Sequence, residues 1–441
     1  MIPLLIAAQA GAQDVQIGLR EACDRAIAAH PDATVADLDV ALARIAARRA
    51  RLDRFQLSVD LTAGVGADWR DPPDVGPTAT HGVDHDLRAT LAVPLFSGFA
   101  NDAAIEAADA RKAASEASRR ATHLELCRAV TMSYWQISGI DLRLAAARES
   151  LDLTREAHGV IRGRADAGLA APIDVNRSAV GLIGEETSLT TLEDERFGAV
   201  VDLARWLDEP ATTMIVPTDP IPDDSTLPTA SQLLERARSS RPDLQAAKAD
   251  VEAARAGERQ ATSAWWPHLT LDATAGTGAS ALGGTSDVGL GPVDLGGITG
   301  DDLRPTHDAG IGLTLHANPF NLFKTADQVT SARLSTEQAE ARLQRLERTV
   351  EADLVAGAHS LRRRAAERDA LGRELELARD NLAIVRELYA LGSATILDLF
   401  DAQQSFRSAN TRAAAASVDL ALFAADLAFQ AGVPPHDLEP P

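Results

Sequence analysis

The sequence FQLSVDLTAGVGADW occupies residues 55–69, and it decides how the rest of the chain is interpreted. Every odd position in this stretch is apolar, and every even position is polar or glycine. Successive side chains of a β-strand point to opposite faces, so the alternation predicts a strand with one apolar and one polar face. The length also suits a strand that crosses a membrane, which needs about 9–11 residues.

Three further stretches follow the same alternation, the first of them more loosely. They are LRATLAV at 87–93, LTLDATAG at 269–276 and AGIGLTLH at 309–316. We therefore expect four strands, at about residues 55–69, 86–96, 268–279 and 308–318. A soluble sheet with one wet face alternates in the same way and would be the first explanation for any single strand. The small polar side chains and the very long helices expected beside each strand pair favour membrane strands.

Aromatic residues are scarce, at 4% of the chain, and they gather at the ends of the expected strands. Girdles of aromatic side chains mark the two edges of the bilayer in membrane barrels. Rings that cap a soluble core are the alternative. We predict a membrane girdle made of Phe55, Trp69, Phe96, Phe99, Trp265, Trp266, Phe320 and Phe323.

Two long proline-free segments predict unusually long helices. No proline lies between Pro94 and Pro172 or between Pro319 and Pro434, and good helix formers fill both segments. We expect helices over about 99–165 and 321–390, each followed by a glycine break and a second helix, over about 172–208 and 396–433. A helix of this length, about 100 Å, needs neighbours along its whole course, as in a coiled coil.

The chain also repeats itself. The sequence AGLAAPIDV at 167–175 recurs as LGSATILDL at 391–399, and the Pro-Asp pair at 31–32 recurs at 242–243. We predict a first repeat over 14–209, a linker over 210–228, a second repeat over 229–433 and a tail over 434–441. Residues 1–13 have the small-x-small pattern of a signal-peptide remnant, although no basic residue precedes Arg20.

Composition excludes several functions. The formal net charge of −21 disfavours a nucleic-acid partner. No Ser/His/Asp set, phosphate loop or zinc motif is present, so we expect no enzyme, no cofactor and no metal site. His81 and His85 fall in an expected loop and are treated as incidental.

Cys23 and Cys127 are expected to be separate small buried residues, with a disulfide left open. No segment approaches the about 20 consecutive apolar residues of a membrane helix.

The glycine breaks, the Pro-Asp openings and the duplicated order of elements together resemble the TolC family of outer-membrane efflux proteins. The resemblance covers about Ile17 to Val433. It implies a homotrimer in the outer membrane, with four strands from each chain in one twelve-stranded barrel and the helices forming a tunnel in the periplasm. The implied function is the exit duct of a tripartite efflux or type I secretion system. The implied partners are a periplasmic adaptor (membrane fusion protein), an inner-membrane transporter and outer-membrane lipid. A soluble or peripheral periplasmic coiled-coil scaffold with a small antiparallel sheet is the alternative.

The glycine breaks are the candidate site. Gly168 and Gly392 end the long helices, and Asp174 and Asp398 follow near the start of the next helix, where a carboxylate also suits plain capping. Asp398 and Asp401 are three residues apart and so share one helix face. Three chains would gather these pairs into an acidic ring that attracts cations, whereas a solvated helix face is the alternative.

The resemblance adds roles at the same place. It matches Asp398 and Asp401 to the acidic constriction of a tunnel entrance, and Tyr389 and Asp174 to positions that pair across a closed tip. It also implies that the adaptor grips Gly168, Leu169, Gly392 and Ser393, although ordinary turn chemistry is the simpler explanation. The chain departs from the family pattern at Ala394, where a basic residue can tie the tip shut. We therefore expect other contacts to hold the closed state.

Overall fold

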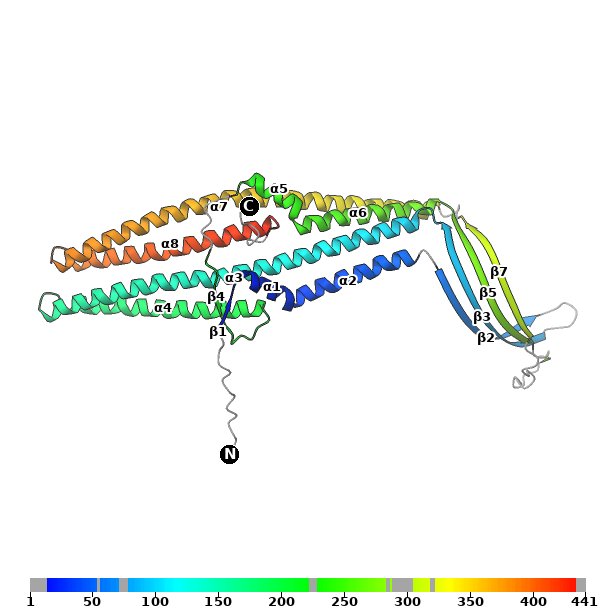
Figure 1. Ribbon diagram of the computed structural model, residues 1–441, viewed down its shortest axis with the longest axis horizontal. Helices are drawn as coiled ribbons and strands as arrows, with labels where there is room; N and C mark the ends of the chain where they lie inside the picture. The colour runs from blue at the N-terminus through cyan, green and yellow to red at the C-terminus, as the bar shows by residue number, and fades with distance from the viewer. Residues whose placement is uncertain are drawn as a thin grey trace, which may run out of the picture. The chain divides into compact units, whose positions relative to one another are not determined.

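The computed structural model describes residues 14–53, 56–70, 78–221, 228–282, 286–287, 304–317 and 322–433 (Figure 1). The chain is mostly helical, with a small sheet part. It divides into two compact units. Unit 1 contains Met1–Val40, Ala114–Ala247 and Arg342–Pro441, and unit 2 contains Ala41–Ala113 and Lys248–Ala341. Each unit therefore draws on both halves of the sequence.

The long helices are confirmed, and each begins within one residue of its expected first residue. They are α3 (Ala100–Asp166) and α7 (Leu322–Ala390), followed by α4 (Pro172–Trp206) and α8 (Ile396–Gln430). The shorter helices are α1 (Leu19–Ala29), α2 (Pro31–Leu52), α5 (Ala230–Ser240) and α6 (Pro242–Thr262). The proline-free segments form these long helices because nothing in them interrupts the backbone hydrogen bonds.

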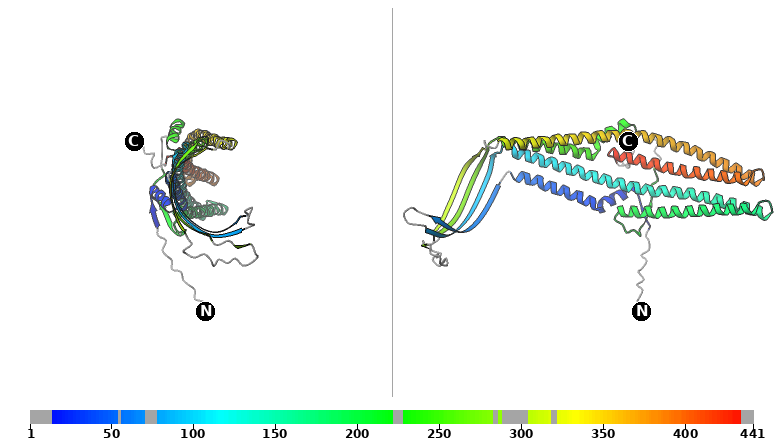
Figure 2. Two further views of the ribbon diagram at one scale, coloured as in Figure 1. Left: turned by 90° about the vertical axis from the view of Figure 1, so that its right-hand side faces the viewer. Right: turned by 180° about the vertical axis from the view of Figure 1, so that it is seen from behind.

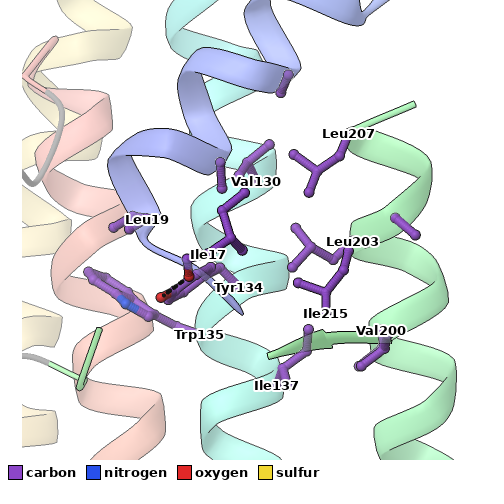
Figure 3. Packing of buried hydrophobic residues seen from close by; sticks show 14 of the residues in the cluster. Ile17, Leu19, Val130, Tyr134, Trp135, Ile137, Val200, Leu203, Leu207 and Ile215 are labelled. Carbon is purple, nitrogen blue, oxygen red and sulfur yellow. Dashed lines mark hydrogen bonds between the residues drawn. The ribbon is translucent and has the colours of Figure 1, made fainter. Parts of the chain in front are cut away.

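The largest apolar cluster of unit 1 joins α1, α3 and α4 with two short strands (Figure 3). These strands are β1 (Asp14–Ile17) and β4 (Met214–Pro217), which pair in parallel. The hydroxyl of the fully buried Tyr134 donates to the carbonyl of Ile17 at 3.0 Å and accepts from the backbone N–H groups of Thr218 and Asp219 at 2.9 and 2.8 Å. The expected linker 210–228 thus contains strand β4. The Tyr134 hydroxyl joins β1 to the residues that directly follow β4.

Cys23 of α1 and Cys127 of α3 form a disulfide inside this cluster. The expectation of two separate buried cysteines was wrong. The sequence offered no sign of the pairing because 104 residues separate the two positions, and only packing of α1 on α3 brings them together. A structural disulfide fits an oxidising compartment outside the cytoplasm.

Two further clusters of unit 1 involve α8. One joins α8 to α5, α6 and α7, and the other joins it to α3 and α7. Within the described residues, α8 is the one helix long and apolar enough to cross a membrane by length and composition. Its large apolar side chains Leu399, Phe406 and Leu427 are buried in these clusters, so α8 serves here as a core helix.

Unit 2 contains an antiparallel sheet in the order β2-β3-β5-β7, with the short β6 (Ser286–Asp287) beside β3. Its long strands are β2 (Gln56–Arg70), β3 (Thr78–Phe96), β5 (His268–Leu282) and β7 (Arg304–His316). Figure 2 shows them running side by side as one curved sheet. Strand β3 begins at Thr78 and not near residue 86, and β7 begins at Arg304 and not near residue 308, so both strands are longer than expected. His81 and His85 accordingly belong to β3 and not to a loop.

Up to the irregularity between Pro94 and Phe96, the register keeps the odd-numbered residues of the four long strands on one face. One row pairs Leu57 with Leu91, Leu91 with Ala273, and Ala273 with Ile311. On β7 this face is open, since Ile311 is 82% and Leu313 63% exposed. The same face is apolar along 87–93, 269–275 and 309–315, and Leu87, Leu91 and Leu271 are also exposed on it.

Candidate functional site

The two glycine breaks form turns with the same backbone geometry. We call residues 167–171 the first turn and residues 391–395 the second turn. Gly168 and Gly392 have φ values of 75° and 78°, a left-handed conformation that glycine adopts most readily. In each turn the glycine N–H donates three residues back, to Ala165 or Tyr389, and the next N–H donates five residues back, to Arg164 or Leu388. This is the Schellman ending of a helix, and it explains why glycine occurs at both places.

Asp398 completes the start of α8. Its carboxylate accepts from the backbone N–H and the hydroxyl of Thr395 at 2.8 and 2.6 Å, and the Thr395 hydroxyl in turn accepts from the Asp398 N–H. These hydrogen bonds hold the pKa of Asp398 below its ordinary value. Helix α4 begins differently, with Pro172 in its first turn and no side-chain cap at Ala171. Capping therefore accounts for Asp398 but not for Asp174.

Asp398 and Asp401 are both exposed on the first turns of α8. Their spacing puts them on one helix face, and Asp401 has no hydrogen-bond partner among the described residues. One chain contributes one such pair. The acidic ring thus remains a hypothesis about an assembly.

Tyr389 is buried at the end of α7, 5% exposed, in the cluster that α3, α7 and α8 share. Burial raises the pKa of its hydroxyl, the Arg164 charge opposes that rise, and the Asp174 charge adds to it. Tyr389 and Asp174 are thus close enough to interact electrostatically, but in the described part of the chain no hydrogen bond joins them.

Arg164 connects the two turns, and the sequence did not single it out. Its guanidinium lies 4.7 Å from the centre of the Tyr389 ring and donates through Nη1 to the Tyr389 carbonyl. A basic residue in the last turn of a helix ordinarily serves its own terminus, so no local pattern links Arg164 to the end of α7. Only the packing of α3 beside α7 reveals the contact.

The turns expose large apolar side chains. Leu169 is 70% exposed in the first turn, and Leu391 is 80% exposed in the second. The neighbouring Gly168, Gly392 and Ser393 are exposed as well. Leu169 was among the residues predicted from the sequence, but Leu391 was not. Leu169 follows its glycine, whereas Leu391 precedes its own.

The even-numbered face of the sheet is polar. Arg88 of β3 approaches Asp308 of β7 at 3.8 Å, and the strand between them contributes Gly276 at the matching position. A Cβ on Gly276 would lie 2.8 Å from Asp308 Oδ1, so glycine leaves room for this pair to meet across β5. Thr314 also donates to Asp272 at 2.6 Å. The described part of the chain contains no group of three or more side chains suited to hold a metal ion.

Five of the predicted girdle residues lie where strands meet helices, namely Phe96, Phe99, Trp265, Trp266 and Phe323. Phe99, Trp265, Trp266 and Phe323 are exposed, and Phe96 contacts Phe99 edge to face at 5.5 Å between ring centres. Gly98 and Phe99 have φ values of 59° and 70°, and a Cβ on Gly98 would lie 2.8 Å from the Ser263 carbonyl and from Trp266 Cβ. Phe55, Phe320 and the side chain of Trp69 lie outside the described residues.

Comparison with known proteins gives a consistent result. A sequence model described as "Outer membrane efflux protein" matches residues 22–207 and 233–433. The pyoverdine export outer membrane protein OpmQ of Pseudomonas aeruginosa is 28% identical over 261 residues, which are 56% of this chain and 55% of OpmQ. The outer membrane protein OprJ of the same species is 27% identical over 387 residues, or 83% of this chain and 74% of OprJ.

Solved structures share the fold. The outer-membrane channel OprN superposes with a TM-score of 0.78 at 22% identity, covering 94% of this chain and 89% of OprN. The outer membrane protein VceC from Vibrio cholerae gives a TM-score of 0.76 at 20% identity, covering 94% of this chain and 96% of VceC.

Proposed function

Because the chain belongs to the outer membrane efflux protein family, we propose that three copies of it form the outer-membrane exit duct of an efflux or type I secretion system. Each copy would contribute four strands to one twelve-stranded barrel. Members of this family are outer-membrane channels and not enzymes. Transported substrates would pass through the lumen passively, with energy supplied by partner proteins.

The observation that carries this proposal is the two-faced sheet with open edges. Within the described residues, the outer edges of β2 and β7 pair with no strand. Lipid has no hydrogen-bonding groups for such edges, so a membrane sheet must close into a barrel. β2 and β7 run in opposite directions, so β7 of one copy can pair antiparallel with β2 of the next. The open apolar face would meet lipid, and the face with Arg88 and Asp308 would line the lumen.

Exposed apolar residues on the helices support a multi-copy assembly. Val35, Leu38, Leu42 and Ile45 recur along α2 at intervals of three and four residues, and all are exposed. This spacing is typical of the side of a helix that packs against a second helix in a coiled coil. We propose that a neighbouring copy of the chain covers it.

We propose that the turns form the gated entrance. Their exposed apolar residues, Leu169 and Leu391, suit docking of a periplasmic adaptor, which would connect the duct to an inner-membrane transporter. Asp398 and Asp401 of three copies would form the acidic ring. The tandem repeat, 14–209 and 229–433 joined by 210–228, is a further proposal, and the matching Schellman hydrogen bonds of the two turns support it.

The experiment compares two adjacent substitutions on β7. Leu313→Arg puts a charge on the apolar face and should block assembly, since an arginine facing lipid costs about 2–4 kcal/mol near the bilayer centre. Gly312→Arg is the matched control, because its side chain would enter open space on the polar face, opposite Asp272. Recovery of a detergent-extracted trimer from the outer-membrane fraction is the measurement.

The outcome separates the membrane duct from a soluble scaffold. For a duct, the wild type and Gly312→Arg give trimers in the outer membrane and Leu313→Arg does not. A water-soluble wild-type monomer, or normal membrane assembly of Leu313→Arg, contradicts the proposal.

A further inference from the structure

We propose that Arg164 is the latch that holds the two turns of one chain together and so keeps the entrance closed. The proposal rests on the duct function above and assigns a residue to its regulation. It also answers a difficulty raised by the sequence, since Ala394 cannot supply the basic side chain that would tie the second turn.

The contact uses three features of one guanidinium. Arg164 lies in the last turn of α3, its Nη1 donates to the Tyr389 carbonyl, and its guanidinium carbon lies over the Tyr389 ring. The Tyr389 carbonyl belongs to the last turn of α7, where it already accepts from the Gly392 N–H and where the helix dipole favours a cation. Arg164 Nη2 also lies near Gly392, 3.9 Å from the position that a Cβ would occupy there. Arg164 thus caps a helix other than its own.

Ion pairs farther from the turns connect the same two helices. Glu149 of α3 pairs with Arg379 of α7 at 2.9 Å, and Glu156 pairs with Arg386 one heptad later. Both pairs span 230 positions, so α3 and α7 run parallel and in register. These pairs are largely exposed, and exposed pairs contribute little.

The Arg164 contact differs from these pairs in its burial. Tyr389 is buried in the apolar cluster of α3, α7 and α8, so its ring and carbonyl are removed from competing water. A charged hydrogen bond and a cation–π contact are both stronger when desolvated. Among the contacts described between α3 and α7 near the turns, Arg164 is therefore the one whose loss should separate them.

Single-channel recording of purified wild-type and variant trimers in planar bilayers tests the latch. Arg164→Ala should raise the ratio of open to closed time by roughly tenfold, equivalent to about 1.4 kcal/mol. Arg162→Ala is the control for lost charge, because Arg162 is exposed two residues earlier on the same helix, and it should behave like wild type. Arg164→Lys keeps the charge but not the planar guanidinium, so its open time should fall between wild type and Arg164→Ala.

Tyr389→Phe separates this latch from a Tyr389–Asp174 pair. Phenylalanine keeps the ring and the carbonyl that Arg164 contacts and removes only the hydroxyl. The latch therefore predicts that Tyr389→Phe stays closed, whereas a hydroxyl–carboxylate pair predicts that it opens.

Each outcome has a definite meaning. Opening of Arg164→Ala, with Arg162→Ala and Tyr389→Phe closed and trimer melting unchanged, supports the latch. An unaltered Arg164→Ala, or a Tyr389→Phe variant that opens equally, overturns it while the duct function stands. If Arg164→Ala fails to assemble, Arg164→Lys decides, and wild-type behaviour of that variant counts against the latch. A wild-type protein that forms no channel overturns both proposals.

Discussion

The carboxylate of Asp398 accepts two hydrogen bonds from Thr395, and these contacts determine what it can add to an acidic ring. Because they lower the pKa of Asp398, their stabilising effect is fully present above the ordinary carboxyl pKa and is lost as the pH falls through the lowered value. Asp398 thus stays charged at neutral pH, but its carboxylate is already hydrogen-bonded to Thr395 at the start of α8. Asp401 is the freer member of the pair.

We predict that Asp401→Asn weakens block of the channel by multivalent cations while α8 keeps its cap. Asp398→Asn should weaken the block as well, but it also removes the negative partner of Thr395 and loosens the first turn of α8. Single-channel recording with a trivalent cation on the tunnel side measures the block, and hydrogen exchange of α8 reports the cap. Unchanged block in the Asp398→Asn, Asp401→Asn double variant would remove the ring from the proposed entrance.

Some residues of the site could be predicted from the sequence, and others could not. Glycine breaks and following aspartates stand out in the sequence because each imposes a local backbone requirement. The Arg164 contact with Tyr389 joins residues 225 positions apart and depends on how α3 packs beside α7. No local pattern encodes such a contact.

At the scale of elements, helix packing depends on two glycines inside long helices. A Cβ on Gly139 of α3 would lie 2.5 Å from Val418 Cγ1, and a Cβ on Gly357 of α7 would lie 2.4 Å from Leu427 Cδ1. Both partners belong to α8. The two glycines thus let α8 approach both long helices closely.

We predict that Gly139→Ala lowers the free energy of unfolding by about 1–3 kcal/mol, because the added methyl group overpacks the contact with α8. Gly159→Ala in the same helix meets nothing within 4 Å and should instead stabilise by up to about 1 kcal/mol through helix propensity. Thermal unfolding of the two variants compares them. If Gly139→Ala instead stabilises the protein, as Gly159→Ala is expected to do, α8 does not pack closely against α3 at Gly139.

The elements themselves were predictable to different degrees. Long helices were located closely because prolines and glycines bound them sharply. The first part of β3 was missed because His81 and His85 occupy odd positions, where the alternation calls for an apolar residue. β1 and β4 were missed because each has four residues and exists only through pairing with the other.

At the scale of the whole molecule, the N-terminal segment is fastened to the middle of the chain. The Cys23–Cys127 disulfide, the β1–β4 pair and the Tyr134 hydroxyl all act on the same region of unit 1. The disulfide is the covalent member of this set.

We predict that Cys23→Ser with Cys127→Ser lowers stability by about 2–5 kcal/mol, the usual loss for a native disulfide. Thermal unfolding of the wild type with and without reductant gives an independent measurement. If the reductant leaves the wild-type transition unmoved while free thiols are detected, the disulfide contributes nothing to stability.

The open edges of the four-stranded sheet have a genetic consequence. In the proposed closed ring of three copies, each chain must offer one sound edge to each neighbour, so one faulty copy leaves a gap that the other two cannot fill. If a cell made normal and edge-defective chains in equal amounts and they mixed at random, only about one eighth of the trimers would be entirely normal. A lesion at the edge of β2 or β7 would then act dominantly, whereas a lesion that keeps the chain from folding would be recessive.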